Sequence, residues 1–220
     1  KCNYVAFLDD DDYYLPKKVE MQLAMFKELD DDKLALVYCY CDEIQNGKVT
    51  MRYRYDYVGS FLYEAMLKCV AATSQWMCRK SCLEKVGCFT NMPCKQDSYV
   101  ILKLLAHGYN LNRVPEVLSI YDNNDRPKIS SKSARKRIEG ETKLRELCRA
   151  NYDKLTTAQQ DNVEYSFACI LAPYYYETGD RKMLADSLRI IMQRPFSGQT
   201  IRVRKILLKK KAKRMFASMK

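Results

Sequence analysis

The sequence predicts an α/β fold: a mixed sheet flanked by helices, followed by an α-helical C-terminal extension. Short β-rich apolar runs alternate with helical periodicity as far as Tyr121, which is typical of this class. From Ala134 onwards helical periodicity dominates. The chain has 220 residues, of which 47% are hydrophobic and 30% charged, so it can bury one sizeable core and a small helical addition.

Turn signals separate the elements of the first part. Asn46-Gly47 indicates a hairpin turn, Gly108 indicates a helix end, and Pro16 suits a first helical turn. We expect strands at residues 4–8, 34–44, 49–57, 71–80 and 111–121. We expect helices at residues 16–32, 59–68, 81–89 and 97–109. The first helix should pack through an apolar face formed by Val19, Leu23, Phe26 and Leu29.

The extension should contain three helices joined by short connections. We expect them at residues 134–151, 158–177 and 182–193, with Gly179-Asp180 as the turn of a helical hairpin. The polar, turn-rich stretch 122–134 should be the loop that leads into them. The expected boundaries are 1–125 for the sheet domain, 134–196 for the helical extension and 197–220 for a basic tail.

The net charge of +11 is concentrated at the C-terminus. Residues 194–220 contain ten Lys and Arg and no Asp or Glu, which leaves 28 basic and 27 acidic residues in the remainder. A nearly neutral body argues against nucleic acid as a partner. Residues 201–216 could form a cationic amphipathic helix on an anionic membrane surface, or a solvated, frayed terminus; we favour the membrane surface.

The ten cysteines could indicate disulfides, a zinc site or buried thiols. Their spacing is irregular, no pair of CxxC motifs occurs, and the chain has only one histidine. Most of the cysteines stand among apolar neighbours. We therefore predict reduced, largely buried thiols, which suits a reducing cytosol.

Four consecutive aspartates, Asp9 to Asp12, follow the first apolar run. Helix capping explains one or two of them, but four adjacent carboxylates repel one another. The carboxyl end of a strand is where open α/β sheets bind their ligands. Hard carboxylate oxygens suit Mg²⁺ or Mn²⁺, and Mg²⁺ is usually held by one or two carboxylates together with substrate phosphates. We therefore expect Mg²⁺ or Mn²⁺ here, with Asp9 and Asp11 approaching one ion from alternate positions.

The segment VAFLDDDDYYLPKKVEMQ resembles the DxD segment of inverting family-2 glycosyltransferases of the GT-A fold. In that family a strand is followed by Asp-x-Asp-Asp, a few mixed residues, Pro and a helix. The segment from Met77 to Tyr121 is similar to the family's downstream block, in which an acidic pair opens a helix ending in Gly-Tyr and a Pro-Glu strand follows. The resemblance covers residues 4–121. It implies a GT-A sheet whose first strands, which bind the nucleotide base, precede this chain, and the chain also opens without an initiator Met.

On the donor side, the resemblance assigns roles to all four aspartates. Asp9 and Asp11 would bind the metal ion that accompanies the donor diphosphate. Asp10 and Asp12 would lie near the donor sugar or its ribose.

On the acceptor side, Asp97 would be the general base that deprotonates the acceptor hydroxyl; capping of the helix that follows is the simpler alternative. Gln96 stands where the family usually has Glu, so it can orient the acceptor only through hydrogen bonds. Trp76 could stack on an acceptor sugar, although a strand residue of this type is as often part of the core.

The resemblance implies an enzyme that transfers a sugar from a nucleotide-sugar donor to a glycan or lipid-linked acceptor, with inversion at the anomeric carbon. The metal ion would neutralise the leaving phosphates, and one carboxylate would activate the acceptor. Three alternatives remain: a metal-dependent nucleotidyl or phosphoryl transferase, a calcium-binding module, and a non-catalytic adaptor at a membrane surface. We expect a cytoplasmic protein, at most peripheral on the cytoplasmic face of the membrane, and a domain without its upstream strands can be inactive.

Overall fold

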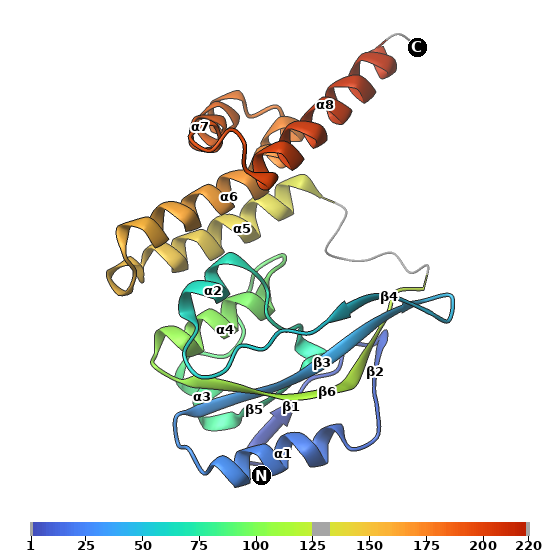
Figure 1. The fold of residues 1–220 in the computed structure, drawn as a ribbon, viewed down its shortest axis with the longest axis vertical. Helices are drawn as coiled ribbons and strands as arrows, with labels where there is room; N and C mark the ends of the chain where they lie inside the picture. Colours follow the sequence, from blue (N-terminus) through green and yellow to red (C-terminus); the bar gives the residue numbers. More distant parts are fainter. Residues whose placement is uncertain (1, 125–132, 219–220) are drawn as a thin grey trace. The chain divides into compact units, whose positions relative to one another are not determined.

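The computed structural model describes residues 2–124 and 133–218 (Figure 1). The chain forms two compact units: Lys1–Asn91 with Gln96–Pro127, and Met92–Lys95 with Lys128–Lys220. The first unit contains the sheet and the second is helical. Most of the loop expected at 122–134 lies outside the described residues.

The first unit is built on a mixed six-stranded sheet. Its strands are β1 (Tyr4–Ala6), β2 (Asp12–Tyr14), β3 (Leu34–Gln45), β4 (Lys48–Tyr53), β5 (Trp76–Arg79) and β6 (Asn110–Asp122). The order is β1-β5-β3-β6-β2, with β4 paired to β3. The long strands β3 and β6 run parallel, and all other pairs are antiparallel. The predicted mixed α/β sheet is therefore confirmed.

Three expected strands are shorter in the structure than in the prediction. The strand expected at residues 4–8 is limited to β1 (Tyr4–Ala6). The hairpin turn at Asn46-Gly47 is confirmed, because both residues have the positive φ angles (51° and 72°) that a type I′ turn requires. Strand β4 nevertheless ends at Tyr53. The start of the expected strand 71–80 instead forms a short 3-10 turn, η1 (Thr73–Gln75), before β5.

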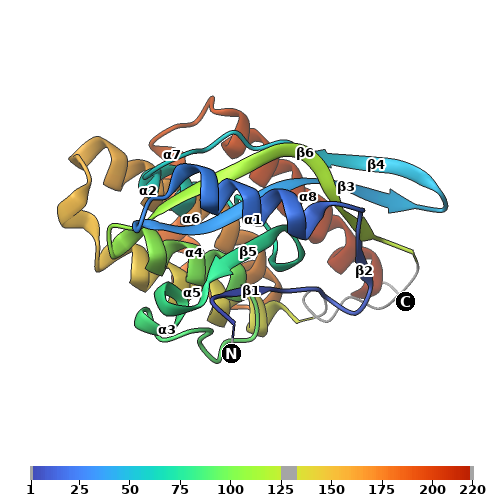
Figure 2. The same cartoon turned by 90° about the horizontal axis from the view of Figure 1, so that it is seen from below.

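Helices cover both faces of this sheet (Figures 1 and 2). Helix α1 (Lys18–Leu29) lies on one face, where Phe26 packs against Leu34, Val37 and Val114. The other helices of the unit are α2 (Leu62–Leu67), α3 (Lys80–Lys85) and α4 (Gln96–Ala106). Figure 1 shows α2 and α4 on the face opposite α1.

The predicted apolar face of α1 was wrong in part. Val19 and Leu29 are exposed (48% and 44%), whereas Lys18 and Gln22 are buried on the same stripe as Phe26. Polar side chains are buried there because they pair with strand carbonyls. Gln22 Nε2 donates to Val37 O (2.9 Å) and Gln75 O (2.8 Å), and Lys18 Nζ donates to Gln22 Oε1 (2.8 Å).

The cysteines are thiols, as predicted. All ten are free, and seven are buried: Cys39, Cys41, Cys78, Cys82, Cys94, Cys148 and Cys169. Cys2 and Cys88 are exposed, so burial does not extend to every member of the set.

The second unit consists mainly of helices α5 (Ala134–Arg149), α6 (Thr157–Thr178), α7 (Arg181–Met192) and α8 (Gly198–Ser218), with a 3-10 turn at Tyr152–Lys154. Gly179, with φ 79°, ends α6, and Asp180 caps α7, so the predicted helical hairpin is confirmed. Val203 of α8 is buried with Ala172 of α6 and Ile191 of α7. The segment expected to be a separate tail is thus a helix that shares the core of α6 and α7. Among the described residues, no helix combines the length and apolarity needed to cross a bilayer.

Candidate active site

The four aspartates occupy a turn that crosses the end of the sheet. Strands β1 and β2 lie at opposite ends of the strand order, so the chain between them must pass over the strands in between. The turn is closed by a hydrogen bond from Asp12 N to Asp9 O (3.1 Å). Asp9 and Asp10 are exposed, Asp11 is half-buried and Asp12 is buried. One short segment therefore presents carboxylates in three different environments.

The η1 turn holds Asp9 in place. Its backbone N–H donates to Ser74 Oγ (3.1 Å), and Thr73 Oγ1 donates to both carboxylate oxygens (3.3 Å each). Partial desolvation raises the pKa of the Asp9 carboxyl; the negative charges of Asp11, Asp97 and Asp10 raise it further, and the Thr73 hydrogen bond lowers it. A bound cation would relieve this repulsion.

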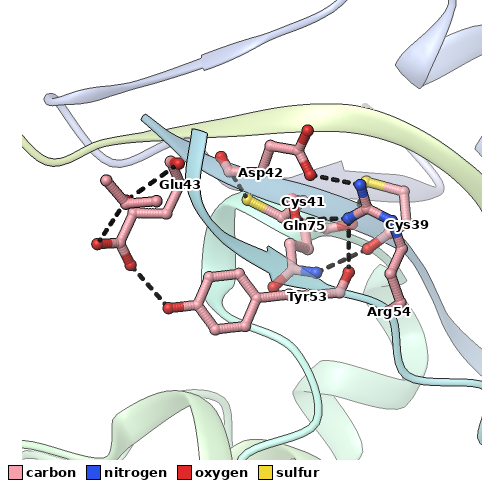
Figure 3. A network of polar contacts seen from close by, with 8 residues as sticks. Cys39, Cys41, Asp42, Glu43, Tyr53, Arg54 and Gln75 are labelled. Atoms are coloured by element: carbon pink, nitrogen blue, oxygen red, sulfur yellow. Dashed lines mark hydrogen bonds and ion pairs between the residues drawn. The ribbon is translucent and has the colours of Figure 1, made fainter. Parts of the chain in front are cut away.

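The η1 turn is itself anchored to β3 by Gln75 (Figure 3). Gln75 Nε2 donates to Cys39 O (2.7 Å), and Gln75 Oε1 accepts from Ala72 N (2.9 Å). The buried Gln22 of α1 donates to Gln75 O. Buried hydrogen bonds from two elements thus fix the turn that holds Asp9.

A second set of polar contacts in Figure 3 ties the base of the β3–β4 hairpin together. Arg54 forms an ion pair with Asp42 and donates to Cys41 O (2.8 Å). Tyr53 Oη donates to Glu43 Oε2 (2.8 Å). These contacts join the end of β4 and the residue that follows it to β3.

Asp12 carries a carboxylate without a conventional partner. Its side chain is 8% exposed, and among the described residues neither oxygen makes a hydrogen bond of normal geometry. Burial raises the pKa of Asp12 to about 6; the charges of Asp11 and Asp9 add to the shift, and nearby Ser74 reduces it. A buried carboxylate with free lone pairs is costly unless a cation or donor group meets it.

Asp97 stands in the first turn of α4. Its Oδ1 accepts from Ser98 N (2.7 Å), and its Oδ2 accepts from Cys69 Sγ (3.2 Å). The side chain is half-buried, so it remains accessible to a ligand. Its charge contributes to the raised pKa of Asp9, which places the two carboxyls in the same electrostatic neighbourhood.

The hydroxyl of Tyr121 on β6 is affected both by the aspartates near β2 and by Asp97 of α4. Burial raises the pKa of its hydroxyl, and four carboxylates raise it further: Asp12, Asp9, Asp97 and Asp11. The backbone of Asp12 is paired with that of Tyr121 in the β2–β6 ladder. Carboxylates predicted from two distant motifs therefore act electrostatically on the same tyrosine.

The sequence did not identify Tyr121, Thr73 or Ser74 as members of the site. Thr73 and Ser74 are polar residues that directly precede β5, and β5 runs antiparallel to β3. The start of such a strand lies at the same edge as the end of its neighbours. That direction, however, could not be read from the sequence.

The two predicted acceptor residues lie in different environments. Gln96 is exposed and adjacent to Asp97. Trp76 is completely buried, packed against Phe7 and Phe89, with its Nε1 donating to Ala71 O (3.3 Å). Its ring therefore belongs to the core and offers no face to a sugar in this structure.

The chemistry of the site suits a hard divalent cation that is bound together with a ligand. Within residues 2–124 and 133–218, no group of three or more His, Cys, Asp or Glu is arranged to hold a metal by itself. The donor set is entirely carboxylate oxygen, and among the described residues the buried oxygens of Asp12 make no hydrogen bond of normal geometry. This fits an ion held by one or two carboxylates that takes its other ligands from phosphate and water.

Comparisons with known proteins identify the fold. No protein-family model matches the sequence, and no curated protein matches it. The structure is similar to residues 1–349 of TarS from S. aureus in complex with UDP-GlcNAc, with 12% identity, a TM-score of 0.53 and coverage of 89% of this chain and 68% of that one. A second S. aureus TarS structure gives 12% identity, a TM-score of 0.51 and coverage of 80% and 29%. At this identity the likeness shows the fold alone, and that fold is the GT-A-like mixed α/β class predicted from the sequence.

Proposed function

We propose that the first unit transfers a sugar from a nucleotide-sugar to a glycan or lipid-linked acceptor. The observation that carries the proposal is that Asp12 is paired with Tyr121 in the β2–β6 ladder, where the charges of Asp12, Asp9, Asp97 and Asp11 all act on the Tyr121 hydroxyl. TarS, which has a similar fold, was crystallised with the nucleotide-sugar UDP-GlcNAc, and this supports a donor of the same chemical class. The chain spans only part of the TarS structures, so the activity of the whole protein is part of this proposal.

On the donor side, Asp9 and Asp11 would hold Mg²⁺ or Mn²⁺ against the diphosphate. When bound, such an ion neutralises the charge that develops on the leaving group. Thr73 would keep the Asp9 carboxylate oriented through its two hydrogen bonds. Asp10 and Asp12 would accept hydrogen bonds from hydroxyls of the donor sugar or ribose.

On the acceptor side, Asp97 would accept the proton of the attacking hydroxyl. Its Oδ1 is oriented by Ser98 and its Oδ2 by Cys69, so the carboxylate is positioned before the acceptor binds. The exposed Gln96 would hydrogen-bond the acceptor without ionising. Attack from the face opposite the leaving diphosphate would invert the anomeric centre.

The proposal is tested by ligand-induced thermal stabilisation in the presence of Mn²⁺, using a panel of nucleotide-sugars and the corresponding nucleoside triphosphates. We expect Mn²⁺-dependent stabilisation by at least one nucleotide-sugar, loss of this effect in Asp11→Asn, and its retention in Asp153→Asn, an exposed aspartate of the second unit. Stabilisation by a triphosphate in preference to every nucleotide-sugar would favour a nucleotidyl or phosphoryl transferase. Absence of any metal-dependent nucleotide effect when the upstream strands that the resemblance implies are also present would favour a non-catalytic protein.

A further inference from the structure

All charged side chains of helix α8 are positive. Residues 198–218 contain no Asp or Glu. Its eight cations are Arg202, Arg204, Lys205, Lys209, Lys210, Lys211, Lys213 and Arg214. Such a density of positive charge on one helix creates a strong local attraction for anionic surfaces.

One side of α8 packs against the other helices of the second unit. Val203 is buried against α6 and α7, and Leu207 packs at the edge of the same cluster. Lys210 forms an ion pair with Glu177 of α6, and the Arg214 guanidinium lies 5.8 Å from the centre of the Tyr176 ring. These contacts fix the orientation of the helix and therefore determine which of its sides is exposed.

The open side carries an apolar stripe. Ile201, Leu208 and Met215 are spaced by seven residues, which is close to two helical turns, so they lie along one line of the helix. Their exposed fractions are 44%, 66% and 57%, and Phe216 beside them is 70% exposed. By helical position this line is turned by about 120° around the helix axis from the side that holds Val203 and Leu207.

Exposed cations border the stripe on both sides. By helical position Arg204 and Lys211 lie along one border, and Lys205 and Lys209 lie along the other. An apolar line between two cationic borders matches the layers of an anionic membrane surface, where apolar side chains enter below headgroups that pair with Lys and Arg.

We propose that the outward side of α8, defined by Ile201, Leu208, Met215 and their cationic borders, binds anionic membrane lipids with the helix lying in the plane of the surface. A second copy of the same side would bring cations against cations, so self-association is disfavoured. A nucleic acid would pair with the cations but leave the apolar stripe exposed. This inference does not depend on sugar transfer, because lipid binding is measured without any nucleotide.

Vesicle flotation of the whole chain tests the proposal, with phosphatidylcholine vesicles compared with vesicles that contain 30% phosphatidylglycerol. The chain should bind the anionic vesicles and not the neutral ones. Leu208→Gln with Met215→Gln should weaken binding by about tenfold or more, because two inserted side chains are lost. The matched control is Val49→Gln with Met51→Gln, which removes two exposed apolar residues of β4 and should bind normally.

A second pair of variants tests the cationic borders. Lys205→Gln, Lys209→Gln and Lys211→Gln combined should weaken binding about 100-fold, since each lysine contributes near an anionic surface. Lys27→Gln, Lys48→Gln and Lys85→Gln remove the same charge from exposed positions of the first unit and should have little effect.

Three results would overturn the proposal. The first is equal binding to neutral and anionic vesicles, or binding to neither. The second is anionic binding that survives Leu208→Gln with Met215→Gln, which would show that charge alone acts, as it would with nucleic acid. The third is a concentration-dependent dimer that only this apolar double variant dissociates, which would assign the stripe to a second copy of the chain.

Discussion

The charge of Asp97 acts on the carboxyl group of Asp9, although the two residues come from distant parts of the sequence. Partial desolvation raises the pKa of Asp9, and the charge of Asp97 is one of the three carboxylates that raise it further. Asp9 follows β1, and Asp97 opens α4. This electrostatic coupling is the observation behind the proposal of one site with a metal side and an acceptor side.

The first prediction follows from this pair. Asp97→Asn removes one negative charge from the surroundings of Asp9, so the pKa of Asp9 should fall towards its ordinary value. The measurement is an NMR titration of the aspartate side-chain carboxyls without divalent cations. Glu116→Gln removes an exposed carboxylate of β6 that is not among the causes of the Asp9 shift, and it should leave the titration unchanged. An unaltered Asp9 pKa in Asp97→Asn would show that the charge of Asp97 does not act on Asp9.

The second prediction concerns Asp12 and the pH dependence of stability. The unfolded carboxyl releases its proton near 3.8 and the folded one, raised by burial, at a pKa of about 6. The folded state therefore holds the proton more tightly, and the free energy of unfolding should fall as the pH rises through this interval. Asp12→Asn should remove this loss and raise metal-free stability at pH 7 by about 1–3 kcal/mol.

Chemical denaturation at pH 4 and pH 7 in the presence of a chelator measures this effect. Asp10→Asn is the matched control, because Asp10 belongs to the same turn but is exposed. The same change in stability between the two pH values in wild type and in Asp12→Asn would contradict this role of Asp12.

The third prediction concerns Glu164, which joins two helices of the second unit. Burial alone would raise its pKa, but hydrogen bonds from Arg149, Arg145 and Tyr152 lower it to about 2. The stabilisation is therefore complete above pH 4.5 and is lost as the pH falls towards 2. Glu164→Gln should cost about 1–3 kcal/mol at pH 7 and little at pH 2.

Urea denaturation at neutral and acidic pH checks the Glu164 prediction. Glu146→Gln changes an exposed glutamate of α5 and should alter stability by less than about 0.5 kcal/mol. Equal effects of the two substitutions at pH 7 would show that the Arg145–Glu164–Arg149 contacts contribute no net stability.

The fourth prediction concerns the close approach of α5 to the segment Met92–Lys95, which belongs to the same unit. A Cβ atom on Gly140 would lie 2.3 Å from Cys94 Sγ and 3.0 Å from Cys94 O. Gly140→Ala should therefore destabilise the protein by about 1–3 kcal/mol, despite the higher helix propensity of alanine. The double variant with Cys94→Ala should recover part of the loss, because the sulfur is the nearer obstacle.

Thermal unfolding of the two single variants and the double variant measures this coupling. Gly198→Ala is a suitable control, since no heavy atom of the described residues lies within 4 Å of the added Cβ position. If Gly140→Ala proved as stable as wild type, the contact with Cys94 would not constrain this helix.

The fold was largely predictable because its signals are local. The alternating runs, the Asn46-Gly47 turn and the helix-ending Gly108 each specify nearby backbone, and the structure confirms them. The packing face of α1 was not predictable in the same way. Lys18 and Gln22 are buried because carbonyls of distant strands accept their hydrogen bonds, and those carbonyls are not visible in the sequence of the helix.

In the candidate site, too, local features could be predicted and contacts between distant residues could not. The Asp9–Asp12 run and Asp97 stand out from local sequence, but their convergence on Tyr121 depends on which strands are neighbours. For Trp76 the sequence left stacking on a sugar and packing in the core equally open. A tryptophan near a predicted site suggests stacking on a sugar, yet packing with Phe7 and Phe89 leaves its ring completely buried.

The most direct test of the central claim separates donor binding from turnover in one experiment. Calorimetric titration with UDP-GlcNAc, or the best nucleotide-sugar of the panel, is combined with product release measured in the same Mn²⁺ buffer. Asp9→Asn should lose metal-dependent donor binding, whereas Asp97→Asn should bind the donor as wild type does and lose turnover by about 100-fold or more. Wild-type turnover in Asp97→Asn, or unchanged metal-dependent binding in Asp9→Asn, would contradict the assignment of a metal side and an acceptor side to this site.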